Sequence, residues 1–237
     1  MRVISIFICV FLCGSLSEAC AEDITPSFSQ KLDIQVRYDN RSNRPSREQY
    51  RLRYYPSLAL TSTWSVNSFI DTGDDFSSSH NTFGSDTTDY LYARRLYLRH
   101  ETNAGKTELG IIPTYKGRVS STGLSKDGWI TGIRHVRKLQ NNTALEIVVG
   151  QLANAEASEA FNVGEEDEYF EIEYSAKMGE RHSYEASFER MLNGTFARAE
   201  YRFRINEEDT AFVELVQRTD ESAAKIVVGT SGEFAAS

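Results

Sequence analysis

Residues 197–205 read Ala-Arg-Ala-Glu-Tyr-Arg-Phe-Arg-Ile, with an apolar residue at every odd position and a charged residue at every even one. This alternation is typical of a β-strand with one apolar and one polar face, because successive side chains point to opposite sides. The same pattern recurs in Leu32–Tyr38, Phe170–Tyr174 and Tyr184–Phe188. Only the Ala- and Glu-rich stretch Leu152–Phe161 has a helical character. The chain is therefore predicted to be all-β.

Strand length is the first indication of the kind of β-protein. The pattern predicts twelve strands, at about 31–39, 48–55, 57–70, 88–101, 106–117, 127–138, 143–152, 168–177, 181–191, 195–205, 209–219 and 223–234. Most have ten residues or more, although Trp129–Arg137 and Thr210–Arg218 alternate poorly. Strands of soluble proteins average about 5–6 residues, whereas strands that cross a bilayer need roughly 9–11. Length favours a single antiparallel up-and-down transmembrane β-barrel.

The connections between these strands differ in length according to their position. Connections after even-numbered strands are short, beginning with a break at Pro56. Several after odd-numbered strands are long, namely Asn40–Arg47, Asp71–Thr87, Arg118–Lys126 and Ala153–Asp167. Bacterial outer-membrane barrels have short periplasmic turns on one side and longer extracellular loops on the other. A soluble sandwich has no reason to sort its loops in this way.

The composition is acidic and polar. The chain has 237 residues, a hydrophobic share of 40%, a net charge of −8 and a mean hydropathy of −0.44. The negative charge argues against a nucleic-acid partner, and no stretch after the first 20 residues is apolar enough to cross a bilayer as a helix. A barrel remains compatible with these values, because half of each strand would face a wet lumen.

The first segment is predicted to be a secretory signal peptide. Met1 and Arg2 precede an apolar run that ends at Leu16, and Ala19-Cys-Ala21 provides an A-x-A cleavage site. We expect residues 1–21 to be removed, residues 22–237 to form the barrel, and the protein to reach the cell outer membrane. All three cysteines lie within the first 20 residues, so the mature chain has none.

In an outer-membrane barrel the apolar face of each strand contacts lipid and the polar face lines the interior. Closure of the sheet then satisfies every backbone N–H and C=O group, which lipid cannot do. Tyr, Trp and Phe lie near strand ends on the apolar face, as interfacial girdles require, and Arg and Glu dominate the other face. The alternative is a periplasmic or secreted β-sandwich that buries the apolar face.

The polar face supplies the candidate pore-lining residues. They are Arg37, Arg51, Arg53, Arg95, Arg99, Lys116, Glu171, Glu173, Glu185, Glu189, Arg198, Arg202 and Arg204. In a closed barrel an arginine wall would face a glutamate patch, and such a transverse field orients dipolar solutes while Arg forks suit carboxylates. Alternatively, these charges pair with one another and fill a narrow interior.

The signal peptide, the cysteine-free acidic mature chain, the alternating strands and the asymmetric loops together resemble Gram-negative outer-membrane porins. In size and strand number the chain is similar to small monomeric porins for acidic oligosaccharides. The stretches Leu91–Leu98 and Gly123–Trp129 also look like segments of larger substrate-selective porins. The resemblance implies the barrel-assembly machinery as a partner. The aromatic residue that this machinery reads is displaced here, because Phe234 is followed by three more residues.

Enzymatic and metal chemistry receive little support from the sequence. The histidines are His80, His100, His135 and His182; Ser120 and Ser121 are close in sequence to His135, but no G-x-S-x-G elbow is present. The acidic stretches 71–75 and 165–168 offer oxygen ligands for Ca²⁺, although solvated surface charge explains them as well. We predict no catalytic residue, no metal and no cofactor.

The sequence thus predicts a porin-like channel for passive diffusion of small, anionic or zwitterionic solutes. Its partners would be outer-membrane lipid and the solutes themselves. Two alternatives remain: a filled barrel with a structural or surface-binding role, and a soluble all-β binding module in the periplasm.

Overall fold

A computed structural model describes residues 25–41, 44–73, 80–84, 91–114, 128–152, 156–162, 169–191 and 194–232. The strands in this part of the chain are β1 (Ser27–Arg41), β2 (Arg44–Ala59), β3 (Trp64–Thr72), β4 (Asn81–Thr82), β5 (Leu91–Thr102), β6 (Gly105–Pro113), β7 (Trp129–Lys138), β8 (Thr143–Gln151), β9 (Tyr169–Met178), β10 (His182–Met191), β11 (Gly194–Arg204), β12 (Thr210–Arg218) and β13 (Ala223–Ser231). The predicted signal peptide, the acidic stretch 165–168 and Phe234 lie outside the described residues.

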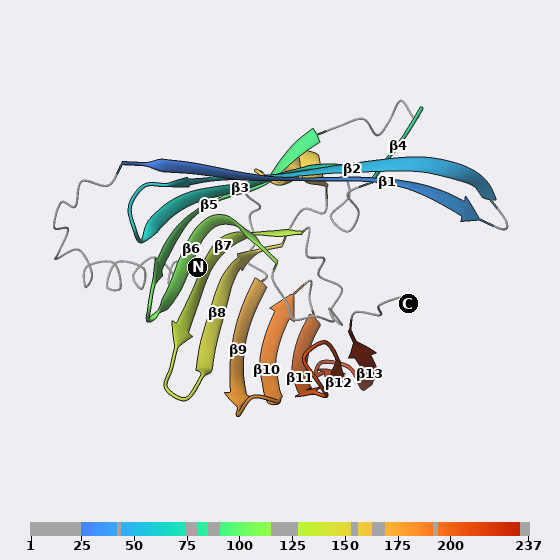
Figure 1. Cartoon of the computed structure of the whole chain (residues 1–237). Helices are drawn as coiled ribbons and strands as arrows, with labels where there is room; N and C mark the ends of the chain where they lie inside the picture. Colours follow the sequence, from blue (N-terminus) through green and yellow to red (C-terminus); the bar gives the residue numbers. More distant parts are fainter. Residues whose placement is uncertain are drawn as a thin grey trace, which may run out of the picture.

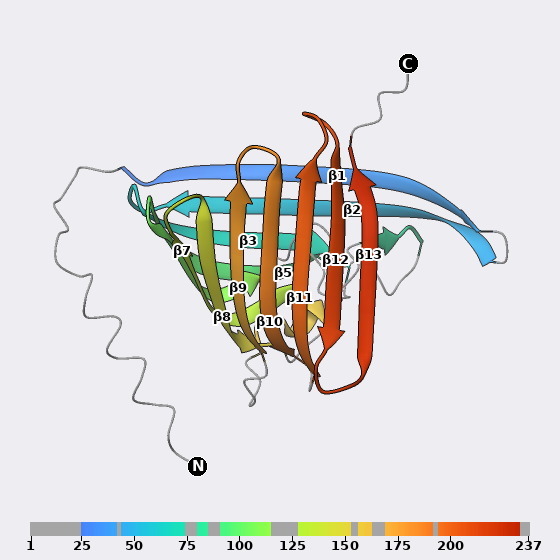
Figure 2. The ribbon, with the colours of Figure 1, turned by 90° about the horizontal axis from the view of Figure 1, so that it is seen from below.

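All the strands belong to one antiparallel sheet, which confirms the predicted all-β, up-and-down architecture. Twelve strands follow one another in chain order, and only the short β4 lies off this path, paired with β2. The sheet curls from β1 and β2 through β6–β8 to β13 (Figure 1). The first strands therefore run across the last ones at a steep angle (Figure 2). Among the described residues, β1 pairs only with β2 and β13 only with β12.

The predicted break at Pro56 is wrong, because β2 continues through this residue to Ala59. Pro56 pairs with Gln30 of β1, whereas the register between β2 and β3 passes over Tyr55 and Pro56. A proline cannot donate a ladder hydrogen bond, so it is tolerated where the pairing is interrupted. The chain turns later, where the backbone N–H of Leu60 donates to the Trp64 carbonyl at 2.8 Å.

The predicted long connection 40–47 is also wrong. β1 extends to Arg41 and β2 begins at Arg44, so these two strands form a long hairpin. The other three long connections, 73–90, 114–128 and 152–168, join β3 to β5, β6 to β7 and β8 to β9, and the strand ends that they join lie at the same end of the up-and-down sheet. The turns at the opposite end are all short. The described part of the predicted helical stretch contains a short 3₁₀ turn, Ala157–Glu159.

A β-bulge at Arg94 changes the parity of β5. Phe69 of β3 pairs with Arg95, but the next residue, Ile70, pairs with Ala93, so Arg94 has no direct partner. A bulge shifts the side chains on one side of it by one position. Leu91 therefore lies on the exposed apolar side and Tyr92 turns inward. Uninterrupted alternation along the strand would place these two residues on the opposite faces.

The sheet is bent where three glycines lie next to one another. Gly110, Gly132 and Gly150 are direct cross-strand neighbours on β6, β7 and β8. The row is flanked by Tyr97 on one side and Tyr169 on the other. A Cβ on Gly132 would lie 2.6 Å from the Gly150 Cα, and Gly110 has a φ of +123°. These close approaches allow the strong curvature of the sheet, since glycines in neighbouring strands act as a kink.

Within the described residues, no helix is long and apolar enough to cross a membrane.

Candidate functional site

The two faces of the curled sheet differ in chemistry. Large apolar side chains on the convex face are exposed, for example Leu109 at 56% and Leu215 at 45%. On the concave face, Glu108, Glu189 and Glu214 are completely buried. A water-soluble protein arranges its side chains the other way round, with charged groups almost never fully buried. The concave, charged face is therefore the candidate functional site.

The first charge cluster of this face surrounds Glu108 on β6. Arg134 of β7 donates to Glu108 at 2.9 Å and to Glu146 of β8 at 2.9 Å. Arg99 of β5 lies 2.8 Å from Glu108, and the ammonium group of Lys106 lies 3.4 Å from it. Three cations therefore surround one buried carboxylate and offset its negative charge. We call these five residues the Glu108 cluster.

The second charge cluster surrounds Arg198 on β11. Its guanidinium donates to Glu214 of β12 at 2.5 Å and to Glu200 at 2.9 Å. Glu185 of β10 and Glu173 of β9 lie 3.5 and 3.8 Å away. Arg202 binds Glu200 and, at 3.3 Å, Glu185. The Arg198 cluster, defined as these six residues, thus ties four neighbouring strands together through charge-assisted hydrogen bonds.

Two further buried carboxylates lie directly opposite each other. Glu171 of β9 pairs with Glu189 of β10, and both are buried. The hydroxyl of Tyr169 donates to Glu171 at 2.8 Å, and that of Ser187 donates to Glu189 at 3.0 Å. These hydroxyls supply the donors that buried carboxylates require.

The arginines of the first strands have different partners. Arg53 lies 3.8 Å from Asp71. Arg95 donates to the Gly128 carbonyl at 2.8 Å, and its guanidinium lies over the Phe69 ring, 4.6 Å from the ring centroid. Arg37 donates to the amide oxygen of Gln49, not to a carboxylate. The buried Nε of Arg51 has no hydrogen-bond partner among the described residues.

The structure therefore separates the thirteen predicted residues into groups. It brings together Arg198, Arg202, Glu173 and Glu185 in one cluster, and places Arg99 in the other. Arg204 is exposed at the end of β11, and Lys116 lies outside the described residues. Within the described C-terminal half, Glu173, Glu185 and Glu214 lie within ion-pair distance of Arg198 on another strand, whereas Glu171 and Glu189 accept hydrogen bonds from hydroxyl groups.

The thirteen predicted residues do not include six members of these clusters: Lys106, Glu108, Arg134, Glu146, Glu200 and Glu214. Glu146 and Glu214 alternate with exposed apolar residues of their own strands, so parity alone would have placed them on the polar face. Arg134 lies in a strand whose alternation is poor, and only the pairing of β7 with β6 and β8 shows which way it points.

Part of the concave side is apolar. Six buried side chains form one cluster near the long connections: Ile112, Ile130, Val148, Leu152, Tyr169 and Met191. Tyr97 and Phe196 pack against it. This cluster fills the space beside the glycine row, so the concave side is not lined by charge throughout.

The histidines occupy separate places. His100 stacks on Trp64 at 4.4 Å near the end of β5, where it shares the parity of Leu96 and Leu98. His182 contacts the Tyr201 hydroxyl at 2.6 Å, and His135 contacts that of Thr107 at 2.9 Å. The described ranges contain no group of three His, Cys, Asp or Glu residues able to hold a metal ion. Ser120 and Ser121 lie outside them.

One titrating group outside the strands is perturbed. Asp220, in the turn between β12 and β13, accepts hydrogen bonds from Arg218 and from the Thr195 backbone, which lower its pKa to about 2. Because its folded-state pKa lies below the usual value, its stabilising contribution is complete at neutral pH and is lost as the pH falls towards 2.

The antiparallel curled sheet, the apolar convex face and the charged concave face define a porin-like β-barrel fold. Structural comparison agrees with this class. Two engineered variants of Rhodobacter blastica porin match with TM-scores of 0.55 and 0.56, at 11% sequence identity in both cases. Each match covers 90% of this chain and 81% of the porin. No protein-family profile and no curated protein sequence matches the chain.

Proposed function

We propose that the protein is an outer-membrane channel through which small solutes diffuse passively. The observation that carries this proposal is the inverted arrangement of the two faces. The convex face exposes Leu109, Phe188 and Leu215, whereas buried Glu and Arg side chains occupy the concave face. Such a surface is favourable in lipid and costly in water. The porin-like fold supports the same conclusion.

The membrane location requires that the sheet close. Of the exposed apolar side chains, those on the edge strands are among the most exposed, with Val36 at 69% and Val228 at 76%. An unpaired strand edge in hydrocarbon leaves backbone N–H and C=O groups without partners. We therefore propose that β1 and β13 pair in the membrane, and that the interior so enclosed is the solute path.

The preferred solutes are small and anionic. In the C-terminal half, Arg134, Arg198 and Arg202 offset the glutamates beside them. In the N-terminal half, Arg37 and Arg51 face no carboxylate among the described residues. Cations that are not neutralised by neighbours attract anions into a low-dielectric passage.

Reconstitution into planar bilayers tests the channel and its selectivity. We expect discrete conductance steps and a reversal potential, in a KCl gradient, that favours chloride. Replacing both Arg37 and Arg51 by glutamate should shift this potential towards cation preference, because the two uncompensated charges change sign. Arg190→Glu is the matched control, since Arg190 is exposed on the convex side of β10 and should leave selectivity unchanged. Absence of any steps would contradict the channel.

The filled barrel is a second candidate, and one observation favours it. The Arg198 cluster and the apolar cluster around Ile112 both occupy the concave side. A small barrel whose interior is filled in this way would insert into the membrane without conducting. Heat-modifiable migration on gels together with silent bilayers would identify this function. A protein soluble without detergent would point instead to the periplasmic binding module.

A further inference from the structure

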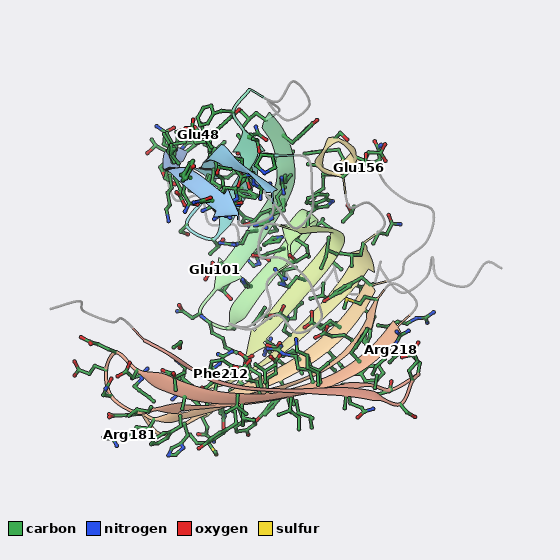
Figure 3. The ribbon with its side chains drawn as sticks, turned by 90° about the vertical axis from the view of Figure 1, so that its right-hand side faces the viewer. Glu48, Glu101, Glu156, Arg181, Phe212 and Arg218 are labelled. Carbon is green, nitrogen blue, oxygen red and sulfur yellow. The ribbon has the colours of Figure 1, made fainter. Side chains whose placement is uncertain are left out.

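A hollow lies on the concave face at the end of the sheet that carries the short turns. Its volume is about 550 Å³, and it is lined by residues of β7–β11 and of the adjoining turns. Arg181, in the turn just before β10, marks the turn end of the sheet, and Arg218, the last residue of β12, marks the loop end (Figure 3). The hollow lies at the turn end. The ion pairs of the two charge clusters and the close packing of the glycine row do not account for this hollow.

Small side chains produce the hollow. Ala144 of β8, Ser175 of β9 and Ser183 of β10 all line it. Ala144 pairs directly with Ser175, and Ser183 lies one row closer to the turns. Because neighbouring strands are about 4.8 Å apart, short side chains at adjacent register positions leave a depression in the floor of the sheet.

Three cations frame the depression. Lys138 of β7 pairs with Ala144, which pairs in turn with Ser175. Lys177 of β9 pairs with Ser183, two residues closer to the turns. Arg202 pairs with Ser183 from the other side. Lys138 and Lys177 lie two strands apart, about 10 Å across the sheet, so their long side chains can reach one small molecule between them.

These cations have donors available. In the described part of the chain, the ammonium groups of Lys138 and Lys177 have no ion-pair partner. Arg202 donates from Nε to Glu200 and from Nη2 to Glu185, and its Nη1 makes no hydrogen bond to the described residues. The two carboxylates therefore fix the position of the guanidinium, and one of its N–H edges remains available.

We propose that this hollow binds the oxyanion group of a small solute, a carboxylate or a phosphate. Lys138 and Lys177 supply positive charge, Arg202 supplies a fixed planar donor, and Ser175 and Ser183 supply hydroxyl donors. Glu185 on its rim is already paired with Arg198 and Arg202, so it does not oppose the anion with a full free charge. The proposal deepens the proposed function and rests on it, since it gives anions entering the channel a binding step at the turn end.

The test measures binding without relying on conduction. The folded full-length protein in detergent is titrated with inorganic phosphate and, separately, with succinate, and binding is followed by calorimetry and by amide chemical shifts of β8–β10. We expect saturable binding of at least one anion, with shifts centred on Ser175 and Ser183. The double variant Lys138→Gln/Lys177→Gln should weaken it at least about tenfold, because two charge-assisted contacts are lost.

Two lysines outside the hollow provide the matched control. Lys31→Gln on β1 and Lys225→Gln on β13 remove the same charge and should leave the affinity unchanged. Phosphate binding alone or succinate binding alone identifies the preferred oxyanion. No saturable binding of either, or equal weakening by the control pair, overturns the site. Anion binding by a protein that does not conduct would contradict the proposed channel and support the anion site. Conduction without anion binding would support the channel and contradict the site.

Discussion

Replacing Arg198 by alanine is expected to lower the free energy of unfolding by about 3–5 kcal/mol, because it leaves buried carboxylates without their cation. Glu214 and Glu200 are almost completely buried and lie 2.5 and 2.9 Å from the guanidinium. Arg202 still contacts Glu200 in this variant, whereas the charge-assisted hydrogen bond from Arg198 to Glu214 is lost. Urea-induced unfolding in detergent micelles, followed by the fluorescence of Trp64 and Trp129, measures the loss.

Two variants separate this effect from a general loss of side-chain packing. Arg198→Lys keeps the positive charge but loses the planar guanidinium group. Its free energy of unfolding should therefore lie between those of the native protein and the alanine variant. Arg204→Ala on the same strand removes an exposed arginine and should change stability by less than about 0.5 kcal/mol. Equal stability of the Arg198 and Arg204 alanine variants would show that the cluster does not stabilise the sheet.

Replacing Gly132 by valine is expected to prevent the sheet from reaching its curved form. Even a Cβ at this position would contact the Val149 carbonyl oxygen and lie 2.6 Å from the Gly150 Cα. Both obstacles are backbone atoms, so the strands themselves must separate, at a cost above about 3 kcal/mol. Loss of the heat-modifiable folded band on gels, and of folded protein in lipid vesicles, would be the measured result.

Gly194→Ala provides the control for this prediction. A Cβ there would lie 2.8 Å from the ring of Phe196, which is a side chain able to rotate away. We expect this variant to fold with a small loss of stability. Normal folding of the Gly132 variant would mean that the glycine row is not the origin of the curvature.

The sequence predicts the architecture well because period-two alternation depends only on neighbouring residues. Arg198, Glu200 and Arg202 alternate with apolar residues, and the structure places all three on the concave face. Local propensity predicts the break at Pro56 and fails there, since the gap in pairing with β3 makes the proline harmless. The register of the neighbouring strand, which no local pattern contains, decides the outcome.

The candidate site is harder to predict from the sequence than the architecture. Parity assigns Glu171 and Arg198 to one face but does not say that Arg198 pairs with Glu214 across to the next strand. The bulge at Arg94 reverses parity within a single strand, and only its pairing with β3 reveals this. The hollow at the turn end depends on three small residues meeting in register, which requires the alignment of β8, β9 and β10.

The inverted arrangement of the two faces is the central claim, and cysteine labelling tests it most directly. All three cysteines lie within the first 20 residues, so residues 21–237 contain none. Ser175→Cys places a thiol on the concave face beside the hollow, and Ala186→Cys places one on the exposed convex face of the adjacent strand. In lipid vesicles, a water-soluble maleimide should label the Ser175 variant and spare the Ala186 variant, while a lipid-soluble thiol reagent should show the opposite preference. Rapid aqueous labelling at position 186 with protection at position 175 would contradict the account.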